Sequence, residues 1–207
     1  MRRRNNRLGA KWQALMATAA VALLCLLSPS VARPEGAQAG DAASKQALDD
    51  FSARVNAYAK LRASLEETLP KLKPTDQPAK LADHDQALSA KVIDTRKNAK
   101  QGDIFTKDIS EQFRQRISEQ LSGQQGREAR QTIRQGEPVE LQVHVNQIYP
   151  AKLPRTTVPP TLLLKLPKLH RGLEYRIIGR TFALYDVKSH MIIDYIPGAL
   201  PAQTPHA

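Results

Sequence analysis

Side chains that could do chemistry are scattered along this 207-residue chain. Imidazole nitrogens bind transition metals, and three of the five histidines lie in or beside the apolar C-terminal part of the sequence. These are His144, His170 and His190. Each stands alone, without a second ligand at helical spacing, so they form a metal site only if the fold brings them together. Beyond these candidates, the sequence predicts no metal ligand and no cofactor.

A second candidate site is a row of arginines at spacings of three and four, which a helix places on one face. The row consists of Arg127, Arg130 and Arg134. Guanidinium groups recognise phosphate and carboxylate through paired hydrogen bonds, so this face is a candidate anion-binding site. The structural alternative is a solvated face whose charge is balanced by Glu128 and Glu137.

Paired carboxylates could cleave glycosidic bonds if the fold brings them together. The candidates are Glu140, Glu174 and Asp194, although salt bridges explain each of them more simply. No serine occupies a G-x-S-x-G elbow, and neither an H-E-x-x-H nor a G-x-x-x-x-G-K-[ST] pattern occurs. Hydrolases and metalloenzymes usually need several such groups at fixed spacing, so the sequence predicts a protein that is not an enzyme.

Helices must position most of these groups. Apolar residues recur at steps of three and four in three segments, which predicts amphipathic helices that bury one face. The segments cover residues 48–72, 79–98 and 109–121. Arg62 is the one charged interruption of the first stripe, and Pro78 suits the first turn of the second helix. The arginine row lies in a shorter polar helix over residues 126–135.

The hydrophobic period changes after Pro138. Apolar and polar residues alternate from Val139 to Val145, which predicts a half-buried strand. Pro160 can begin a short apolar helix that runs through Leu166. The leucines of this helix are expected to be buried at one end of the core. The closing segment then predicts three strands, with a tight turn at Gly179. They cover residues 173–178, 181–186 and 190–196.

Apolar residues occupy both alternating positions of the closing strands, so both faces of the sheet are expected to be covered. A helix layer on one side, and the Val139 strand or a partner on the other, would account for this. Ile178 and Ile192 are therefore candidate partner-binding residues. The polar residues Arg176, Arg180, Asp186 and Asp194 are expected to form pairs that fix the hairpins.

Together these patterns predict an α+β fold. An N-terminal helical region of three to four amphipathic helices at residues 45–136 precedes a small antiparallel β-sheet in a β-rich region at residues 137–197. Residues 33–44 are small, polar and rich in Gly and Pro, which indicates a flexible leader. Residues 198–207 are expected to form a disordered tail.

The N-terminus has the organisation of a secretory signal peptide over residues 1–32. A basic segment through Lys11 precedes an apolar run that ends in small residues. Cleavage is predicted after Ala32 or, as a second choice, after Ala39. The alternative is an uncleaved membrane anchor, since residues 12–31 have about the length of a membrane span.

The charge is moderately basic. The formal net charge is +11, and five of the 31 Lys and Arg residues lie in residues 1–32. The mature chain therefore carries about +6, enough to be drawn to anionic surfaces but short of a dedicated nucleic-acid binder. Cleavage also removes Cys25, the only cysteine, so the mature chain has no disulfide. A secreted or periplasmic location in the bacterial envelope is expected.

Several motifs occur in a characteristic order. They are Phe51-x-x-Arg54-Val55, Leu61-Arg62, Leu69-Pro70, Gly102-Asp103-Ile104-Phe105-Thr106, Val158-Pro159-Pro160, Leu173-Glu174-Tyr175-Arg176, Gly179-Arg180 and Asp186 to Ile193-Asp194. In these motifs nearly all of the mature chain resembles a family of uncharacterised secreted bacterial proteins. The resemblance implies a helical front and a small β tail, and it implies no activity. Residues 175–194 are also similar to periplasmic proteins linked to nickel and cobalt homeostasis.

The sequence favours an exported, non-enzymatic protein that binds another protein or an anionic envelope component. Two alternatives stay open: a periplasmic metal-responsive protein and a cell-wall hydrolase. Nucleic acid is not expected as a partner, because of the export signal and because no basic patch is interleaved with aromatic residues. No membrane span is expected after signal cleavage.

Overall fold

The computed structural model describes residues 35–71, 77–124, 126–135, 141–150, 153 and 156–201, except for the side chains of residues 35–39, 132, 134 and 135. From Glu35 onwards the chain forms one compact unit. The predicted signal peptide lies outside the described residues and stays a prediction, as does the predicted tail beyond Pro201. Among the helices within these ranges, none is both long enough and apolar enough to cross a membrane.

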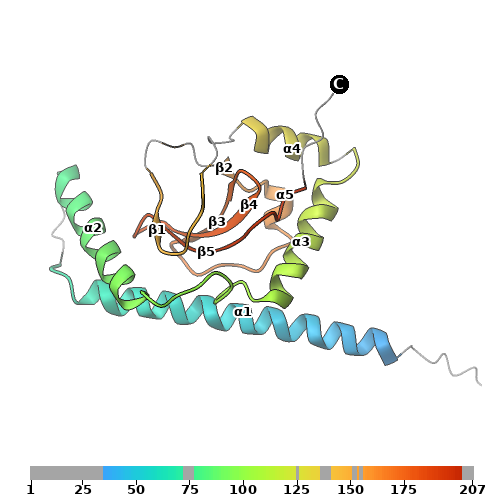
Figure 1. The fold of residues 1–207 in the computed structure, drawn as a ribbon, viewed down its shortest axis with the longest axis horizontal. Helices are drawn as coiled ribbons and strands as arrows, with labels where there is room; N and C mark the ends of the chain where they lie inside the picture. The colour runs from blue at the N-terminus through green and yellow to red at the C-terminus, as the bar shows by residue number, and fades with distance from the viewer. Residues whose placement is uncertain are drawn as a thin grey trace, which may run out of the picture. The chain divides into compact units, whose positions relative to one another are not determined.

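Helices come first along the chain, as the periodicity predicts (Figure 1). The described residues form α1 (Glu35–Glu67), α2 (Pro78–Thr95), α3 (Lys107–Leu121), α4 (Gly126–Gln135) and the short α5 (Pro160–Leu163). Helix α1 begins at Glu35, inside the segment expected to be a flexible leader, where alanines favour the helix. Pro78 occupies the first turn of α2, where its missing N–H costs nothing.

An antiparallel sheet follows, and it makes the fold α+β as predicted. Its strands are β1 (Gln147–Ile148), β2 (Thr156–Thr157), β3 (Leu173–Ile178), β4 (Thr181–Asp186) and β5 (Met191–Ile196), in the order β1-β5-β4-β3-β2. The three C-terminal strands lie where the sequence predicts them. Gly179 has a φ of 56° in the turn between β3 and β4, a conformation that glycine adopts without strain.

The strand predicted from Val139 to Val145 is wrong over its described part. Residues 141–144 pair with no strand, and the chain joins the sheet only at β1. Between them Asn146 has a φ of 61°, and it exchanges hydrogen bonds of 2.7 and 2.8 Å with the side chain and carbonyl of Arg96. Val143 is nevertheless buried. The alternation of apolar and polar residues therefore predicts correctly that Val143 is buried, but it does not predict whether this segment pairs with a strand.

One face of the sheet packs against the helices. The chain has four phenylalanines, and all of them meet in this cluster, with neighbouring ring centroids 5.4 to 6.2 Å apart. They are Phe51 of α1, Phe105, Phe113 of α3 and Phe182 of β4. Such offset and edge-to-face contacts add to the free energy gained from apolar burial. The helical front and the β tail consequently share one core.

The other face of the sheet carries a second, smaller cluster. Its fully or nearly buried members are Val143, Tyr149, Ile178, Ala183, Tyr185 and Ile192. The covering residues come from the segment that precedes and follows β1, so the chain itself covers this face. Ile178 and Ile192 are 4% and 0% exposed and do not present a free surface to a partner.

Asp194 joins the sheet to the start of α3. The register between β4 and β5 shifts after Leu184, and this bulge leaves Ile193 without a partner across the ladder. The Asp194 carboxylate then accepts hydrogen bonds from four backbone N–H groups, at 2.7 to 3.0 Å. The donors are Gly102, Ile104, Phe105 and Tyr195. The expected role within a hairpin is therefore corrected, because Asp194 organises a loop 90 residues earlier in the chain.

Asp186 joins the sheet to α1. Its carboxylate lies 2.9 Å from the Arg62 guanidinium and accepts a hydrogen bond of 2.6 Å from the Tyr58 hydroxyl. The Arg62 and Asp186 side chains are 5% and 0% exposed, so the ion pair is buried. Arg62 also donates to the carbonyls of Arg171 and Gly172. The charge that interrupts the first apolar stripe thus has a buried partner on the sheet. Asp186 also accepts a hydrogen bond of 3.0 Å from the Lys188 N–H in the turn of its own hairpin.

Replacing Asp194 with Asn should lower the free energy of unfolding by about 3 kcal/mol, because the amide nitrogen cannot accept and leaves buried N–H donors unsatisfied. Urea unfolding followed by circular dichroism measures this change. Asp49→Asn on the exposed face of α1 is the control and should change stability by less than about 0.5 kcal/mol. Equal effects of the two substitutions would contradict the role of Asp194.

Burial raises the pKa of Tyr58 and of Tyr175 above the ordinary range, and the nearby Asp186 charge raises that of Tyr58 further. Above about pH 10 the unfolded chain loses these two protons while the folded chain keeps them. Stability should therefore fall as the pH rises above 10, by about 1.4 kcal/mol per pH unit for each tyrosine. Urea unfolding between pH 9 and 11.5 should give a shallower slope for Tyr58→Phe. An unchanged slope would refute this account.

Candidate functional site

The structure does not bring the three candidate histidines together in one group of possible metal ligands. His144 is exposed, and the ring of His170 contacts the Arg171 carbonyl at 3.1 Å. His190 lies between the Asp85 carboxylate and the Tyr185 hydroxyl, each 3.2 Å from one ring nitrogen. Within the described ranges, no three His, Cys, Asp or Glu side chains lie close enough together to hold a metal ion.

The arginine row lies on α4, as predicted, but it is not a set of equivalent free cations. Arg130 donates hydrogen bonds to the carbonyls of Leu121 and Gly123. These carbonyls lie at the C-terminal end of α3, where a cation also interacts favourably with the helix dipole. Arg127 is exposed, and the side chain of Arg134 lies outside the described residues. Arg130 therefore has a structural role that its spacing alone does not reveal.

The described candidate carboxylates also have structural partners. Glu174 forms an ion pair with Arg176 two residues along β3. Asp194 is fully buried under its four N–H donors. Glu140 lies outside the described residues. Asp194 therefore lacks the accessible carboxylate that glycoside cleavage needs, and Glu174, whose side chain is 44% exposed, has no accessible second acid among the described candidates.

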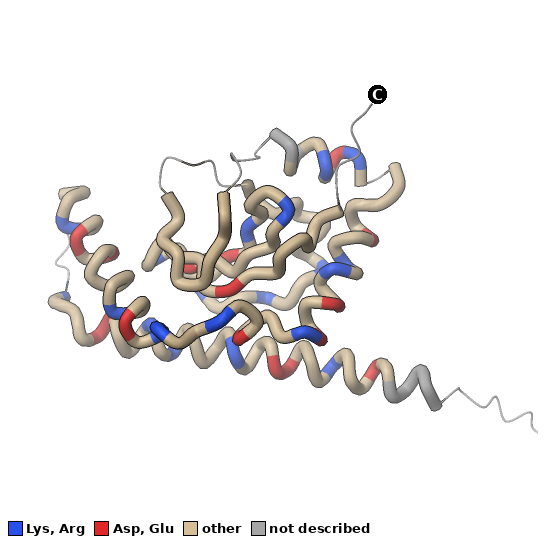
Figure 2. Tube along the Cα trace, in the orientation of Figure 1, with Lys and Arg blue, Asp and Glu red and all other residues tan. Residues whose placement is uncertain are grey.

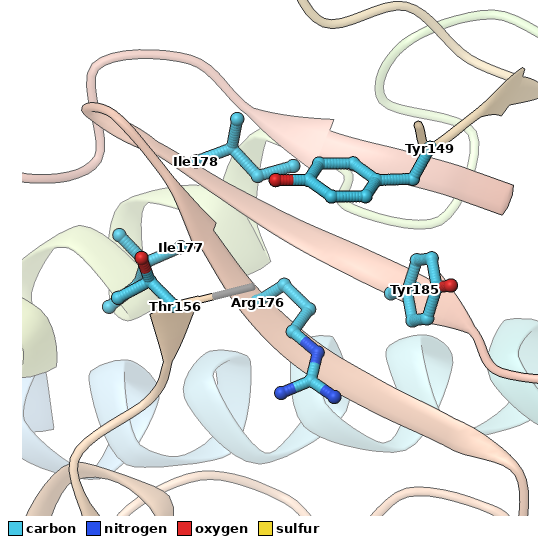
Figure 3. A pocket seen from close by; sticks show the side chains of 6 residues that line it. All are labelled: Tyr149, Thr156, Arg176, Ile177, Ile178 and Tyr185. Atoms are coloured by element: carbon cyan, nitrogen blue, oxygen red, sulfur yellow. The ribbon is translucent and has the colours of Figure 1, made fainter. Parts of the chain in front are cut away.

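A narrow pocket lies at the β2 end of the sheet (Figure 3). It is lined by Tyr149, Thr156, Arg176, Ile177, Ile178 and Tyr185, and the space inside it is about 10 Å³. Figure 3 shows the Arg176 side chain between Thr156 and Tyr185, and its guanidinium lies 5.8 Å from the centre of the Tyr185 ring. This volume suits one water molecule at most, so the pocket cannot accept a substrate.

A larger cleft opens beside the same strand and is called the α5–β3 cleft here. Its volume is about 600 Å³. It is lined by Thr157, Val158, Leu163, Leu166, Pro167, Lys168, Leu169, Leu173, Glu174, Tyr175 and Arg176. Small-molecule sites usually enclose about 300–1,000 Å³ and have mostly apolar walls with a few polar groups. The α5–β3 cleft has this volume and this chemistry.

The loop that follows α5 is fixed against the core. The Tyr175 hydroxyl donates a hydrogen bond of 3.0 Å to the Pro167 carbonyl, and Arg116 of α3 donates one of 3.0 Å to the Lys165 carbonyl. Leu162 and Leu166 are 0% and 7% exposed and anchor the segment from below. The walls of the cleft are therefore held in place from two sides.

The prediction that all the leucines of α5 plug the core is only half right. Leu162 and Leu166 are buried, but Leu163 is 43% exposed and Leu164 is 85% exposed. Successive residues of a helical turn point about 100° apart, so four closely spaced leucines cannot all face the same core. The structure thus places two apolar side chains in solvent beside the cleft.

The surroundings of the cleft are basic. Between residues 156 and 180 the sequence has five Lys and Arg residues and one acidic residue, Glu174, which pairs with Arg176. Lys165 and Lys168 are exposed, and in the described part of the chain no carboxylate forms an ion pair with either. Elsewhere, Figure 2 shows acidic and basic residues interspersed along the helices. Lys168 at the wall of the cleft and Lys165 in the same loop are therefore exposed cations whose charge no described carboxylate balances by an ion pair.

Comparisons with known proteins do not identify a function. The chain matches no family model, no curated protein and no solved structure. The chemistry of the α5–β3 cleft is consequently the basis for the function proposed below.

Proposed function

We propose that this protein is exported and binds an anionic component of the bacterial envelope at the α5–β3 cleft, without catalysing a reaction. The observation that carries the proposal is an apolar cleft of about 600 Å³ beside two lysines for which the described residues provide no acidic partner. A ligand with an apolar part and a negative group would satisfy both properties of the cleft at once.

The charge distribution favours an anion over a neutral ligand. Surface ion pairs contribute little to stability, but unpaired lysines on one surface attract anions over about 10 Å at physiological salt. Lys165 and Lys168 are both exposed and lie on the same short loop after α5. Arg116, which bonds to the Lys165 carbonyl, adds a third cation from α3.

The contacts of the described carboxylates support binding rather than catalysis. Glu174 and Asp194 are the described acids considered for glycoside cleavage, and each is held by an ion pair or by backbone donors. Glycoside cleavage needs two acids that both reach the bound substrate, and the buried Asp194 cannot do so. The α5–β3 cleft has Glu174 at its wall, but the nearest partner of that carboxylate is Arg176.

Charge reversal at the cleft should weaken binding to anionic envelope material. In the chain from Arg33, which retains both apolar clusters, Lys165→Glu/Lys168→Glu should lower the affinity for immobilised lipopolysaccharide and for soluble polyphosphate. The expected loss is at least about tenfold, since each cation near an anionic surface is worth about 1 kcal/mol. Surface plasmon resonance at two salt concentrations measures it.

The matched control is Lys80→Glu/Lys97→Glu, which makes the same change of net charge at exposed positions on and after α2. It should retain most of the binding, and both variants should unfold at the wild-type temperature. If the two variants lose affinity equally, or if the wild-type chain binds neither probe, the proposed function is wrong.

A further inference from the structure

Leu163 and Leu164 stand out among the exposed apolar side chains of the described residues. Leu164 is 85% exposed, whereas Leu81, Ile93 and Ile148 are 38% to 50% exposed and are isolated from one another in the sequence. Leu163 and Leu164 are adjacent, and both lie at the end of one helical turn. Single exposed leucines are ordinary, whereas this adjacent pair concentrates exposed apolar surface at one place.

The leucine pair is held in its exposed position by the residues around it. Leu162 and Leu166 are anchored in the core on either side, and Pro159, Pro160 and Pro167 restrict the backbone that enters and leaves the turn. The Arg116 guanidinium fixes the Lys165 carbonyl at 3.0 Å. Turning Leu164 into the core would require breaking these contacts, so the pair is a rigid projection.

Cations lie next to this projection along the chain. Lys165 follows Leu164 directly, Lys168 comes three residues later in the loop, and Arg116 contacts the same segment from α3. Exposed leucines next to exposed lysines have the composition that interfacial membrane segments use: the apolar side chains enter the acyl boundary and the cations reach lipid phosphates. Long basic side chains suit this position because their methylene stems tolerate apolar surroundings.

We propose that Leu163 and Leu164 form an insertion tip that docks the protein on an anionic phospholipid bilayer, with Lys165 and Lys168 against the lipid phosphates. This inference rests on the proposed function and names the anionic component as a lipid bilayer. A folded protein partner fits less well, because a stable interface buries about 800 Å² on each side, far more than two leucines offer. A bilayer needs no complementary pocket and accepts a narrow projection.

Tryptophan fluorescence tests insertion directly. The chain from Arg33 contains no tryptophan, because the only one in the sequence is Trp12, so Leu164→Trp introduces a single reporter. Vesicles of 30% phosphatidylglycerol in phosphatidylcholine should shift its emission to the blue, and brominated acyl chains should quench it. Vesicles of phosphatidylcholine alone should produce much weaker binding, since they lack the negative charge.

Sedimentation with the same vesicles measures what each group contributes. Leu163→Ser/Leu164→Ser should lower the partition coefficient at least about tenfold, because two apolar side chains no longer enter the membrane. Lys165→Glu/Lys168→Glu should lower it by a similar factor. The control is Leu81→Ser/Ile93→Ser, which removes two exposed apolar side chains from α2 and should leave binding unchanged.

The outcomes separate this inference from the proposed function. If Leu163→Ser/Leu164→Ser loses vesicle binding but still binds soluble polyphosphate, the insertion tip is supported. If it binds vesicles like the wild type, or if the wild type binds polyphosphate but no vesicles, the tip is refuted while the proposed function stands. Light scattering provides a further test. If the wild type is a dimer and this variant is a monomer, a second copy covers the leucines and the tip is refuted. Failure of the wild type to bind either probe overturns both.

Discussion

The fold depends on two buried aspartates of neighbouring strands, and each one holds a different part of the helical front. Asp194 of β5 satisfies backbone N–H groups that would otherwise be buried without acceptors at the entrance to α3. Asp186 of β4 neutralises Arg62 and binds the Tyr58 hydroxyl, which fixes α1 against the sheet. A buried carboxylate is costly unless it is fully paired. Both aspartates are paired in this way. The helices are therefore fixed against the sheet in one arrangement, in which the surrounding phenylalanines pack together.

Much of the fold follows from the periodicity of the sequence. The apolar stripes within α1, α2 and α3 and the short apolar runs of β3, β4 and β5 are local signals. The apolar positions of α3, such as Phe113, are buried as expected. The ladders of β1 and β2 could not be predicted in the same way. Each has two residues, too few for a period, and β1 starts only where the contact between Arg96 and Asn146 turns the chain. The helical start at Glu35 likewise reflects alanine content in a segment whose glycines suggest a loop.

The candidate site was harder to predict from the sequence, because it depends on which side chains are exposed to solvent. A leucine-rich turn looks the same whether its side chains enter the core or solvent, and only the packing of Leu162 and Leu166 decides which leucines remain outside. The arginine row on α4 has a clear helical spacing, yet Arg130 donates a hydrogen bond to the Leu121 carbonyl at the end of α3. Conversely, Arg62 was visible as an anomaly within an apolar stripe, and a buried partner is the physical reason for such a residue. An unexpected charge was thus a better guide than a regular row.

The late position of the two aspartates along the chain has a consequence for the order in which the protein folds. The Tyr58 contact with Asp186 spans 128 residues, and the Ile104 contact with Asp194 spans 90. A chain is synthesised from its N-terminus, so α1 and α3 are made long before Asp186 and Asp194. The two helices therefore lack these hydrogen-bond partners until nearly the whole chain is available, because the long loops must close before the contacts form. The helices cannot complete their packing early. If the chain crosses a membrane as a thread, this topology delays folding until the passage is almost finished.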